Sequence, residues 1–407
     1  MVADNPDVLI TGLGATTPVG GDVAATWAAL VAGESGIGPI DEEWTQTLPV
    51  RIAGRLKVEP TTVLDRVQAR RMDRCEQIAL VAAREAWADA GAPEVAPERL
   101  AVVVGTGTGG ALTLLGQDDV LEAAGVRRVS PHTVPMLMAN GPAAWVSIEL
   151  GARAGAHTPV SACASGAEAI ALGLDLIRAG RADVVVAGGT EACICPLPLA
   201  GFAQAKAHST CNDAPTRASR PFDVDRDGFV IGEGCALLVL ERAAFAAARG
   251  ARAHASLVGA GITSDAHHIT AGHPEGQARA MRLALAAAGL APRDITHVQA
   301  HATGTQVGDL VEARSITEAL GDHPVVTATK SMTGHLFGAA GALGALAAVL
   351  AVRDGVVPAT QNLDVQDPGI ALDVVRGAPR RGPVPAALAN AFGFGGHNIS
   401  LIVTPAP

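Results

Sequence analysis

The sequence predicts an α/β protein in which one arrangement of strands and helices occurs twice. Apolar runs of strand length alternate with alanine-rich runs of helical length along the 407 residues, which is typical of layered α/β folds. The chain also exceeds the size at which single hydrophobic cores stop growing, so two domains or one duplicated unit are expected. Because the pattern restarts near Arg249, we expect two halves, residues 1–250 and 251–407.

In the first half, each expected strand is a short apolar run and each expected helix is a longer run rich in alanine. The expected strands are 8–10, 100–104, 183–187 and 235–240, and the expected helices are 23–32, one or two within 63–90, and 166 to about 178.

The second half repeats this alternation, with expected strands 256–260, 297–300, 325–328 and 400–403. Between the last two lies Leu336–Val352, a run without a charged residue. It is at the short end of the membrane-spanning range and is dominated by alanine and glycine, which contribute little to insertion. We therefore expect a buried central helix and not a membrane span.

Composition narrows the class of protein. Hydrophobic residues make up 49% of the chain, but aromatic residues only 3%, with no tyrosine, so the core must be built from small aliphatic side chains. A net charge of −10 argues against nucleic acid as the main partner. The six irregularly spaced cysteines indicate reduced thiols of the cytoplasm, and Met1–Asp7 lacks the apolar run of a signal peptide.

The stretch Thr158–Ile170 places Cys163 at the turn between an expected strand end at Val160 and a helix beginning at Gly166. Unpaired N–H groups and the positive end of the helix dipole favour a thiolate there, and the thiolate is the nucleophilic form. A buried structural cysteine also fits this stretch, because free cysteine is among the most buried residue types.

The glycine run at 105–110 formally matches the dinucleotide fingerprint G-x-G-x-x-G after a strand. One match in a chain with 47 glycines is weak evidence, and Asp118, Asp119 and Glu122 come too early for the acidic partner. A tight turn after the strand is the better interpretation.

Two further stretches carry residues suited to catalysis. His301 follows the expected strand 297–300, where functional residues of α/β sheets gather. His335 lies between a strand and a helix, where backbone dipoles favour neutral imidazole. Lys330 is one of three lysines in the chain, and a lysine among apolar residues is expected to be functional or ion-paired. Each histidine taken alone is more often a satisfied core residue.

A metal site is not expected. His267, His268, His273, Cys193 and Cys195 do not form a plausible full ligand set.

Four motifs together resemble those of the β-ketoacyl-acyl carrier protein synthases. They are S-A-C-A-S-G at Ser161, H-A-T-G-T-x-x-G-D-x-x-E at His301, K-S-x-x-G-H-L-x-G-A-A-G at Lys330 and N-A-F-G-F-G-G-H-N at Asn390. The resemblance extends from Leu9 to about Val403, and it is to the elongating branch shared by type II fatty acid synthesis and type II polyketide ketosynthases. It implies a thiolase-like duplicated fold of five layers, αβαβα, in a dimer.

The resemblance also implies roles for residues. Cys163 would take an acyl chain from a carrier-protein thioester, and His301 and His335 would promote loss of CO₂ from malonyl-carrier protein. The N–H groups of Cys163 and Phe394 would form the oxyanion hole. Lys330 and Glu312 would be a buried pair that orders the histidines, and no metal or organic cofactor is implied.

Positions 108 and 133 match family positions that shape the acyl tunnel and are commonly bulky and apolar, but here both are threonine. Because a buried hydroxyl without a partner costs roughly 1–3 kcal/mol, these residues favour unsaturated or oxygenated chains of a polyketide or polyene pathway. The threonines could instead point away from the chain. The expected pocket residues are Thr108, Thr133, Thr303, Thr305, Phe392 and Phe394.

The implied partners are an acyl carrier protein and a second subunit, which would be either a further copy or a chain-length factor; neither nucleic acid nor a membrane is expected. Carrier proteins are acidic, so a local basic patch is required on this acidic chain. The docking residues expected from the resemblance are Arg66, Arg70, Arg71, Arg127, Arg128 and Lys206.

Three other functions compete. A thiolase or coenzyme A-primed ketosynthase would use Cys-His-Asn or Cys-His-Cys, whereas the motif at Lys330 favours Cys-His-His. A chain-length factor, a non-catalytic subunit, would lack the nucleophile that Cys163 supplies. A dinucleotide-dependent oxidoreductase rests only on the glycine run.

Overall fold

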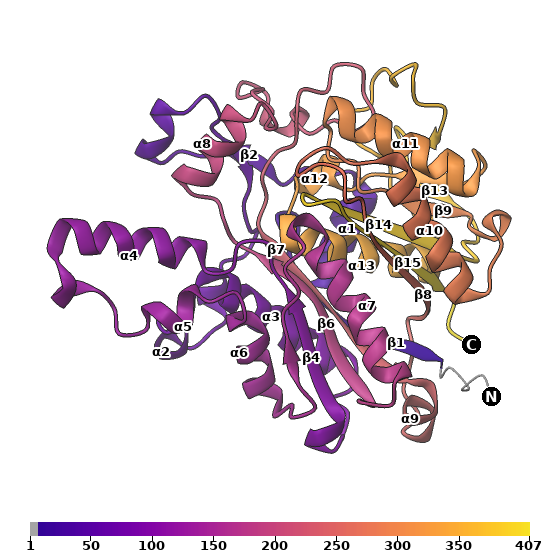
Figure 1. The fold of residues 1–407 in the computed structure, drawn as a ribbon, viewed down its shortest axis with the longest axis horizontal. Coiled ribbons are helices and arrows are strands. Elements are labelled where there is room, and N and C mark those ends of the chain that lie inside the picture. The colour runs from indigo at the N-terminus through magenta and orange to yellow at the C-terminus, as the bar shows by residue number, and fades with distance from the viewer. Residues whose placement is uncertain (1–6) are drawn as a thin grey trace.

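The computed structural model describes residues 7–407, so most of the segment tested for a signal peptide lies outside the described residues. Its core is an 11-stranded sheet (Figure 1). In spatial order the strands are β12 (Asp373–Val374), β10 (Val325–Thr327), β9 (His297–Gln299), β14 (Ala387–Gly393), β15 (His397–Thr404), β8 (Ala255–Ser264), β1 (Val8–Thr16), β7 (Gly234–Arg242), β6 (Val184–Glu191), β4 (Leu100–Gly105) and β5 (Ala156–His157).

The two halves of this sheet repeat one pattern of strand directions. In the first half, β1–β7 and β7–β6 are antiparallel, and β6–β4 and β4–β5 are parallel. In the second half, β8–β15 and β15–β14 are antiparallel, and β14–β9 and β9–β10 are parallel. The halves join where β1 pairs with β8. The duplicated α/β fold predicted from the sequence is confirmed.

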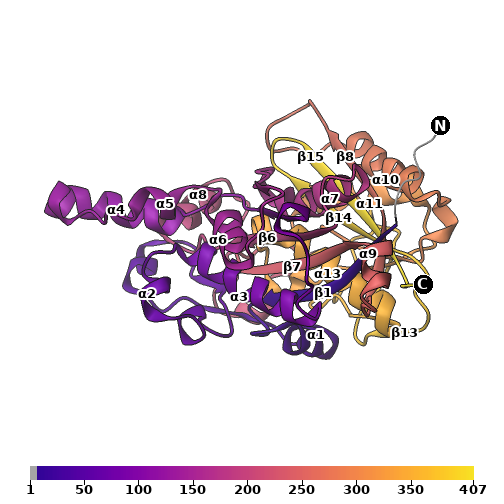
Figure 2. The same ribbon diagram turned by 90° about the horizontal axis from the view of Figure 1, so that it is seen from below.

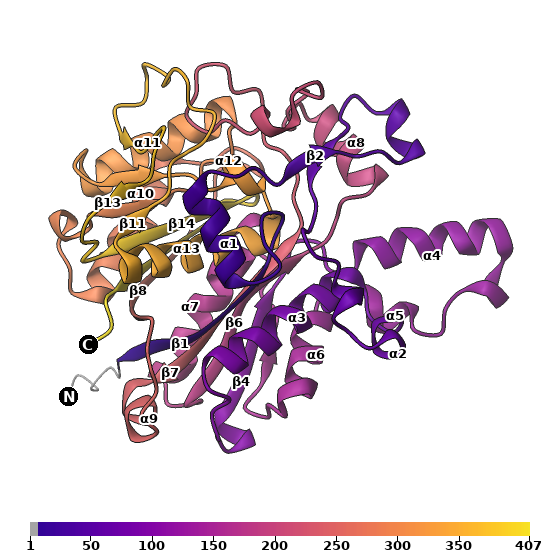
Figure 3. The ribbon, with the colours of Figure 1, turned by 180° about the vertical axis from the view of Figure 1, so that it is seen from behind.

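Helices complete five layers. α7 (Ser165–Arg178) and α13 (Ala340–Asp354) lie between the two halves of the sheet and share one core with both. α3 (Arg74–Asp89) and α6 (Gly141–Leu150) cover the other face of the first half. α10 (Pro274–Ala288) and α11 (Gln306–Leu320) cover the second half. Figures 1 and 3, seen from opposite sides, show α7 and α3 on opposite faces.

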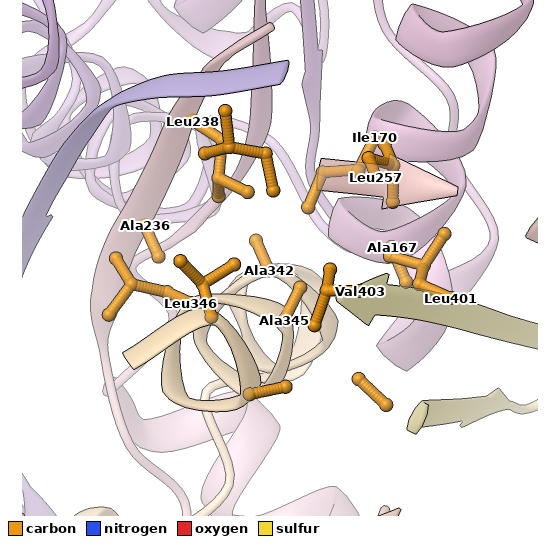
Figure 4. Close-up of a cluster of buried hydrophobic side chains, with 14 of the residues drawn as sticks. Ala167, Ile170, Ala236, Leu238, Leu257, Ala342, Ala345, Leu346, Leu401 and Val403 are labelled. Atoms are coloured by element: carbon orange, nitrogen blue, oxygen red, sulfur yellow. The ribbon is translucent and has the colours of Figure 1, made fainter. Parts of the chain in front are cut away.

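Helix α13 confirms the expectation of a buried central helix. The segment Phe337–Asp354 is long and apolar enough to cross a membrane, but 83% of it is buried within the protein. Figure 4 shows its residues Ala342, Ala345 and Leu346 among side chains from both halves. Small residues set the spacing, because a Cβ at Gly341 would lie 2.8 Å from the Cβ of Ala167 on α7.

An arm extends from the first half. It consists of α4 (Ala111–Ala124) and α5 (Thr133–Leu137), and it projects from the body in Figures 1 and 2. None of the residues of α4 is buried, and Leu114 and Leu121 are half-exposed at 53% and 47%. This arm, α6, α10, α11 and β14 were not anticipated from the sequence.

The remaining elements are short. They are α1 (Val23–Ala32), α2 (Arg66–Ala69), α8 (Pro196–Gln204), α9 (Ala243–Ala248), α12 (Lys330–Thr333), and the two-stranded sheets β2 (Ile37–Pro39) with β3 (Ile52–Gly54) and β11 (Val356–Val357) with β13 (Arg380–Arg381).

Candidate active site

Cys163 lies in a strained turn at the start of α7. Strand β5 ends at His157, earlier than expected, and one 3₁₀ turn, Ala162–Ala164, leads directly into the helix. Ala162 has a φ of 51°, a left-handed conformation that costs an alanine roughly 1–2 kcal/mol. Only 9% of Cys163 is exposed. The turn holds the sulfur at the end of the central layer, as the position before the helix predicted.

The pKa of Cys163 moves in the direction opposite to the sequence-based expectation. Burial raises it to about 12, opposed by the charge of Lys330 and by the N–H groups of Phe394 and Cys163 itself. Desolvation of the charged sulfur therefore outweighs the donors at the helix start. Cys163 is a thiol near neutral pH, and it must lose its proton as it reacts. The same two N–H groups were expected to form the oxyanion hole.

His301 and His335 meet beside this turn, although 34 positions separate them in the chain. Their rings are nearly perpendicular, at 86°, with centroids 5.3 Å apart. Both histidines are buried. Burial, and then the charge of Lys330, hold both pKa values well below the usual 6.5. Both imidazoles are neutral, as expected, but desolvation and not a helix dipole is the main cause.

Aromatic rings fix the histidines in place. The ring of Phe337 lies 4.7 Å from that of His335, and the ring of Phe392 lies 5.8 Å from that of His301. Phe229 also contacts His335, at 5.6 Å. The Nδ1 atoms of both histidines are buried without a hydrogen-bond partner among the described residues.

Lys330 and Glu312 act on His301 through its main chain. Lys330 donates to the His301 carbonyl, and Glu312 accepts from the N–H groups of His301 at 2.8 Å and Ala302 at 2.6 Å. No direct ion pair joins the two side chains in residues 7–407, so the expected pair is indirect. Burial lowers the pKa of Lys330 to about 8, opposed first by Glu312. Asn390 donates to Glu312 at 3.2 Å and completes the cluster.

The expected pocket residues are only partly gathered here. Phe392 is buried against His301, whereas 43% of Phe394 is exposed. Thr303 and Thr305 are partly buried after β9, with their hydroxyls 3.2 Å apart.

Thr108 and Thr133 do not carry the unpartnered hydroxyls that the sequence suggested. The Thr108 hydroxyl donates to Glu191 at 2.6 Å, and the Thr133 hydroxyl donates to the Ser130 carbonyl at 2.7 Å. Both polar groups are already satisfied within the chain. The physical reason for preferring an oxygenated or unsaturated substrate is therefore removed.

Backbone N–H groups of the glycine run at 105–110 donate to a side chain of the protein itself. Glu191, the last residue of β6, is fully buried and accepts from the N–H groups of Gly107 at 2.8 Å and Thr108 at 3.2 Å. These are the donors that a phosphate would need. Sequence reasoning missed Glu191, because the segment G-G-T-E at the end of a strand carries no signal of a charge buried there.

The six expected docking residues are all exposed. They come from α2 and its end (Arg66, Arg70, Arg71), from the loop between α4 and α5 (Arg127, Arg128) and from the end of α8 (Lys206). None of them forms a salt bridge within the described part of the chain. Arg74, in contrast, pairs with Glu59 and Glu233.

The other histidine group lies on the surface. The rings of His267 and His273 are 5.0 Å apart and line a shallow hollow with Asp265 and Arg279. Across residues 7–407, no group of three His, Cys, Asp or Glu side chains could hold a metal ion.

Comparisons with known proteins cover almost the whole chain. Family models described as the N-terminal and C-terminal domains of β-ketoacyl synthase match residues 5–246 and 254–364. The chain is 49% identical over 402 residues to the 3-oxoacyl-[acyl-carrier-protein] synthase 2 of Mycobacterium tuberculosis, covering 97% of this chain and 96% of the relative.

Two solved structures cover 99% of this chain and all of their own. One is the ishigamide ketosynthase/chain length factor, with a TM-score of 0.93 and 35% identity. The other is a type II PKS acyl-carrier protein in complex with its ketosynthase bound to the hexaketide, with a TM-score of 0.91 and 28% identity.

Proposed function

The chain belongs to the β-ketoacyl synthase family, and we propose that it condenses an acyl group held on Cys163 with a malonyl group held on an acyl carrier protein. The observation that carries the assignment of residues is the convergence of Cys163, His301 and His335 around Lys330, whose charge acts on all three. A non-catalytic chain-length factor would not need this arrangement.

The first half-reaction loads the acyl group. The sulfur of Cys163 attacks the carbonyl carbon of the acyl thioester, a new C–S bond forms, and the carrier leaves as its thiol with the proton that Cys163 gives up. The carbonyl oxygen becomes negative during the attack. The N–H groups of Phe394 and Cys163, which already face the sulfur, would stabilise this negative oxygen.

The second half-reaction forms the new C–C bond. The malonyl carboxylate leaves as CO₂, and the electron pair of the broken bond becomes an enolate. His301 and His335 donate to its oxygen, for which neutral imidazoles in a dry site are suited. The enolate carbon attacks the acyl carbon, the bond to Cys163 breaks, and the released thiolate takes a proton from solvent. Glu312 and Lys330 position His301 by its main chain.

We propose a second subunit at the arm and at the edge strand. Strand β5 ends the sheet with one side unpaired, and α4 leaves Leu114 and Leu121 half-exposed. Unpaired strand edges and clustered apolar side chains favour association. A second copy of this chain would cover both. The alternative occupant is a chain-length factor.

We further propose that the reaction takes place in the cytoplasm, a reducing compartment that suits the six free cysteines. We also propose that the exposed arginines bind the acidic carrier protein. We also propose that the two halves of the chain divide near residue 250. Reversing the charge of Arg127 and Arg128 should raise the KM for carrier-bound substrates about tenfold and leave a small thioester unaffected. Equal effects on both substrates would exclude docking there.

The proposed function is tested with the chain purified alone. Incubated with acyl- and malonyl-carrier protein, it should yield β-ketoacyl-carrier protein and CO₂ in equal amounts, with an acyl adduct on Cys163. If condensation requires an added second protein, the partner is a chain-length factor. Condensation with acyl-coenzyme A but not with acyl-carrier protein would favour the coenzyme A-primed alternative.

A further inference from the structure

Glu191 is a fully buried carboxylate that accepts from five donors. Its Oε1 receives the hydroxyls of Thr106 at 3.1 Å and Thr108 at 2.6 Å and the N–H of Thr108 at 3.2 Å. Its Oε2 receives the N–H groups of Gly107 at 2.8 Å and Gly338 at 3.0 Å. No basic side chain pairs with it among the described residues. All five groups donate to Glu191, an arrangement that suits an ionised carboxylate, and protonation would remove acceptor capacity that these donors use.

The donors belong to two segments that meet the reacting residues. On one side, Gly338 follows Phe337, whose ring packs against His335 at 4.7 Å. On the other side, the carbonyl of Thr106 accepts from the hydroxyl of Ser165, the first residue of α7, at 3.1 Å. Ser165 also accepts from the N–H of Ser161, which begins the Cys163 turn. One carboxylate therefore connects the segment that holds His335 with the segment that holds Cys163.

The Phe337–Gly338 and Thr106–Thr108 segments are packed closely where both contact Glu191. A Cβ at Gly338 would lie 2.4 Å from the nitrogen of Gly107, and a Cβ at Gly107 would lie 2.6 Å from Oε2 of Glu191. Neither glycine can therefore carry a side chain while the two segments keep this packing. The position of Phe337, and with it that of His335, depends on whether Glu191 can accept from both segments at once.

We propose that Glu191 is a positioning residue for the condensation, which holds the Phe337–Gly338 segment against Thr106–Thr108 so that His335 and Cys163 face the same substrate. This inference rests on the proposed function, because it names a residue that supports that reaction. It also gives Thr108 a different role: its hydroxyl is a donor to Glu191 and not a polar lining of the acyl pocket.

The proposal predicts a pH dependence. Burial raises the pKa of Glu191, while the hydroxyl of Thr108 and the N–H groups of Gly338 and Gly107 lower it. The other titratable groups that face Glu191 are the thiols of Cys163, Cys193 and Cys75. All three have raised pKa values and are neutral at acid pH. Protonation of Glu191 would remove an acceptor, so the malonyl decarboxylation rate should fall on the acid side.

The direct test is Glu191→Gln. A carboxamide in either orientation places an NH₂ group against N–H donors that now have an acceptor. We expect kcat for malonyl-carrier protein decarboxylation to fall about 10²-fold, KM to stay within about threefold, and the acid limb of the pH profile due to Glu191 to disappear. A matched control is Glu85→Gln. Glu85 also accepts from two main-chain N–H groups, of Ala15 and Val23 at 2.8 Å each, but it contacts no site residue.

A milder variant keeps the test decisive if Glu191→Gln does not fold. Thr108→Val removes one donor to the carboxylate and should move the acid limb up by about one pH unit, the equivalent of one hydrogen bond to a charged group. Thr108→Ser restores the hydroxyl and should return the limb to its wild-type pH. An unshifted limb in Thr108→Val, or a Glu191→Gln enzyme with wild-type kcat, would overturn the proposal. A wild-type chain that stays inactive both alone and with an added second protein would instead overturn the proposed function.

Discussion

The two halves of the molecule contain the same strained turn and use it differently. In the first half, Ala162–Ala164 forms one 3₁₀ turn before α7, and Ala162 has a φ of 51°. In the second half, Phe337–Ala339 forms one 3₁₀ turn before α13, and Phe337 has a φ of 42°. The central residue is Cys163 in the first turn and Gly338 in the second.

Each turn packs against the other half of the sheet. The Gly338 turn meets the end of β6, where a Cβ at Gly189 would lie 2.4 Å from the Gly338 carbonyl. The Cys163 turn meets the end of β14, where a Cβ at Gly393 would lie 2.3 Å from the Ser161 carbonyl. In the second half, the N–H of Gly338 at the turn donates to Glu191. In the first half, the equivalent N–H, that of Cys163, faces the thiol of Cys163, so it stays available to a substrate oxygen. Duplication thus supplied one reactive turn and one supporting turn.

Replacing the reactive centre should have the largest effect. Cys163→Ala makes the first turn resemble the second, so we expect acyl loading to vanish and condensation to fall by at least ~10³-fold. Intact-protein mass spectrometry measures the loading. Decarboxylation of malonyl-carrier protein should remain measurable, because the histidines act on that substrate. Residual loading on another cysteine would contradict the assignment.

The histidines should separate the two half-reactions. His301→Ala and His335→Ala each remove a donor to the enolate, and we expect decarboxylation to fall ~10²–10³-fold while loading of Cys163 stays measurable. Radiolabelled CO₂ release and adduct mass give the two rates. Lost loading with intact decarboxylation in both variants would reverse the roles.

Burial of the first turn predicts how Cys163 responds to pH. Because its pKa is raised to about 12, only the small thiolate fraction reacts with iodoacetamide near neutral pH. Its alkylation rate should rise with pH from 7 to 10, nearly tenfold per pH unit at pH values away from 8. The rise should weaken around pH 8, where Lys330 loses the charge that lowers the pKa of Cys163. A rate that levels off below pH 8 would show a thiolate favoured by the helix start.

The supporting turn should tolerate no side chain. Gly338→Ala places a Cβ 2.4 Å from the Gly107 nitrogen, and we expect a loss of roughly 1–3 kcal/mol in unfolding free energy, measured by thermal denaturation. The control is Gly344→Ala on α13, whose nearest atom would be 3.6 Å away. There the helix interior should gain up to about 1 kcal/mol. Equal stability of both variants would show that the turn at Gly338 is no more tightly packed than the helix at Gly344.

The smallest effect concerns substrate. Since the hydroxyls of Thr108 and Thr133 are satisfied within the chain, neither should select for polarity near the acyl group. Saturated and polyunsaturated acyl-carrier proteins of equal length should be elongated within about threefold of each other. A strong preference for the polyunsaturated chain would restore the polar pocket inferred from the sequence.

The sequence by itself determined the fold class and the duplication, and it predicted which residues react. Strand and helix periodicity located β4, β6, β7 and α7 closely, because their apolar patterns are local and regular. The four motifs indicated the family, and the resemblance to that family singled out Cys163, His301 and His335. The arm helix α4 escaped because its apolar residues are exposed and show no single buried face.

Only the tertiary structure decided the electrostatics of the site. The pKa of Cys163, the indirect link between Lys330 and Glu312, and the partners of Glu191 and Thr108 all depend on residues more than ten positions apart in the chain. A carboxylate buried among donors and one exposed to water look alike in a sequence. Desolvation and hydrogen-bond satisfaction are properties of the assembled surroundings, so the fold must form before either has a value.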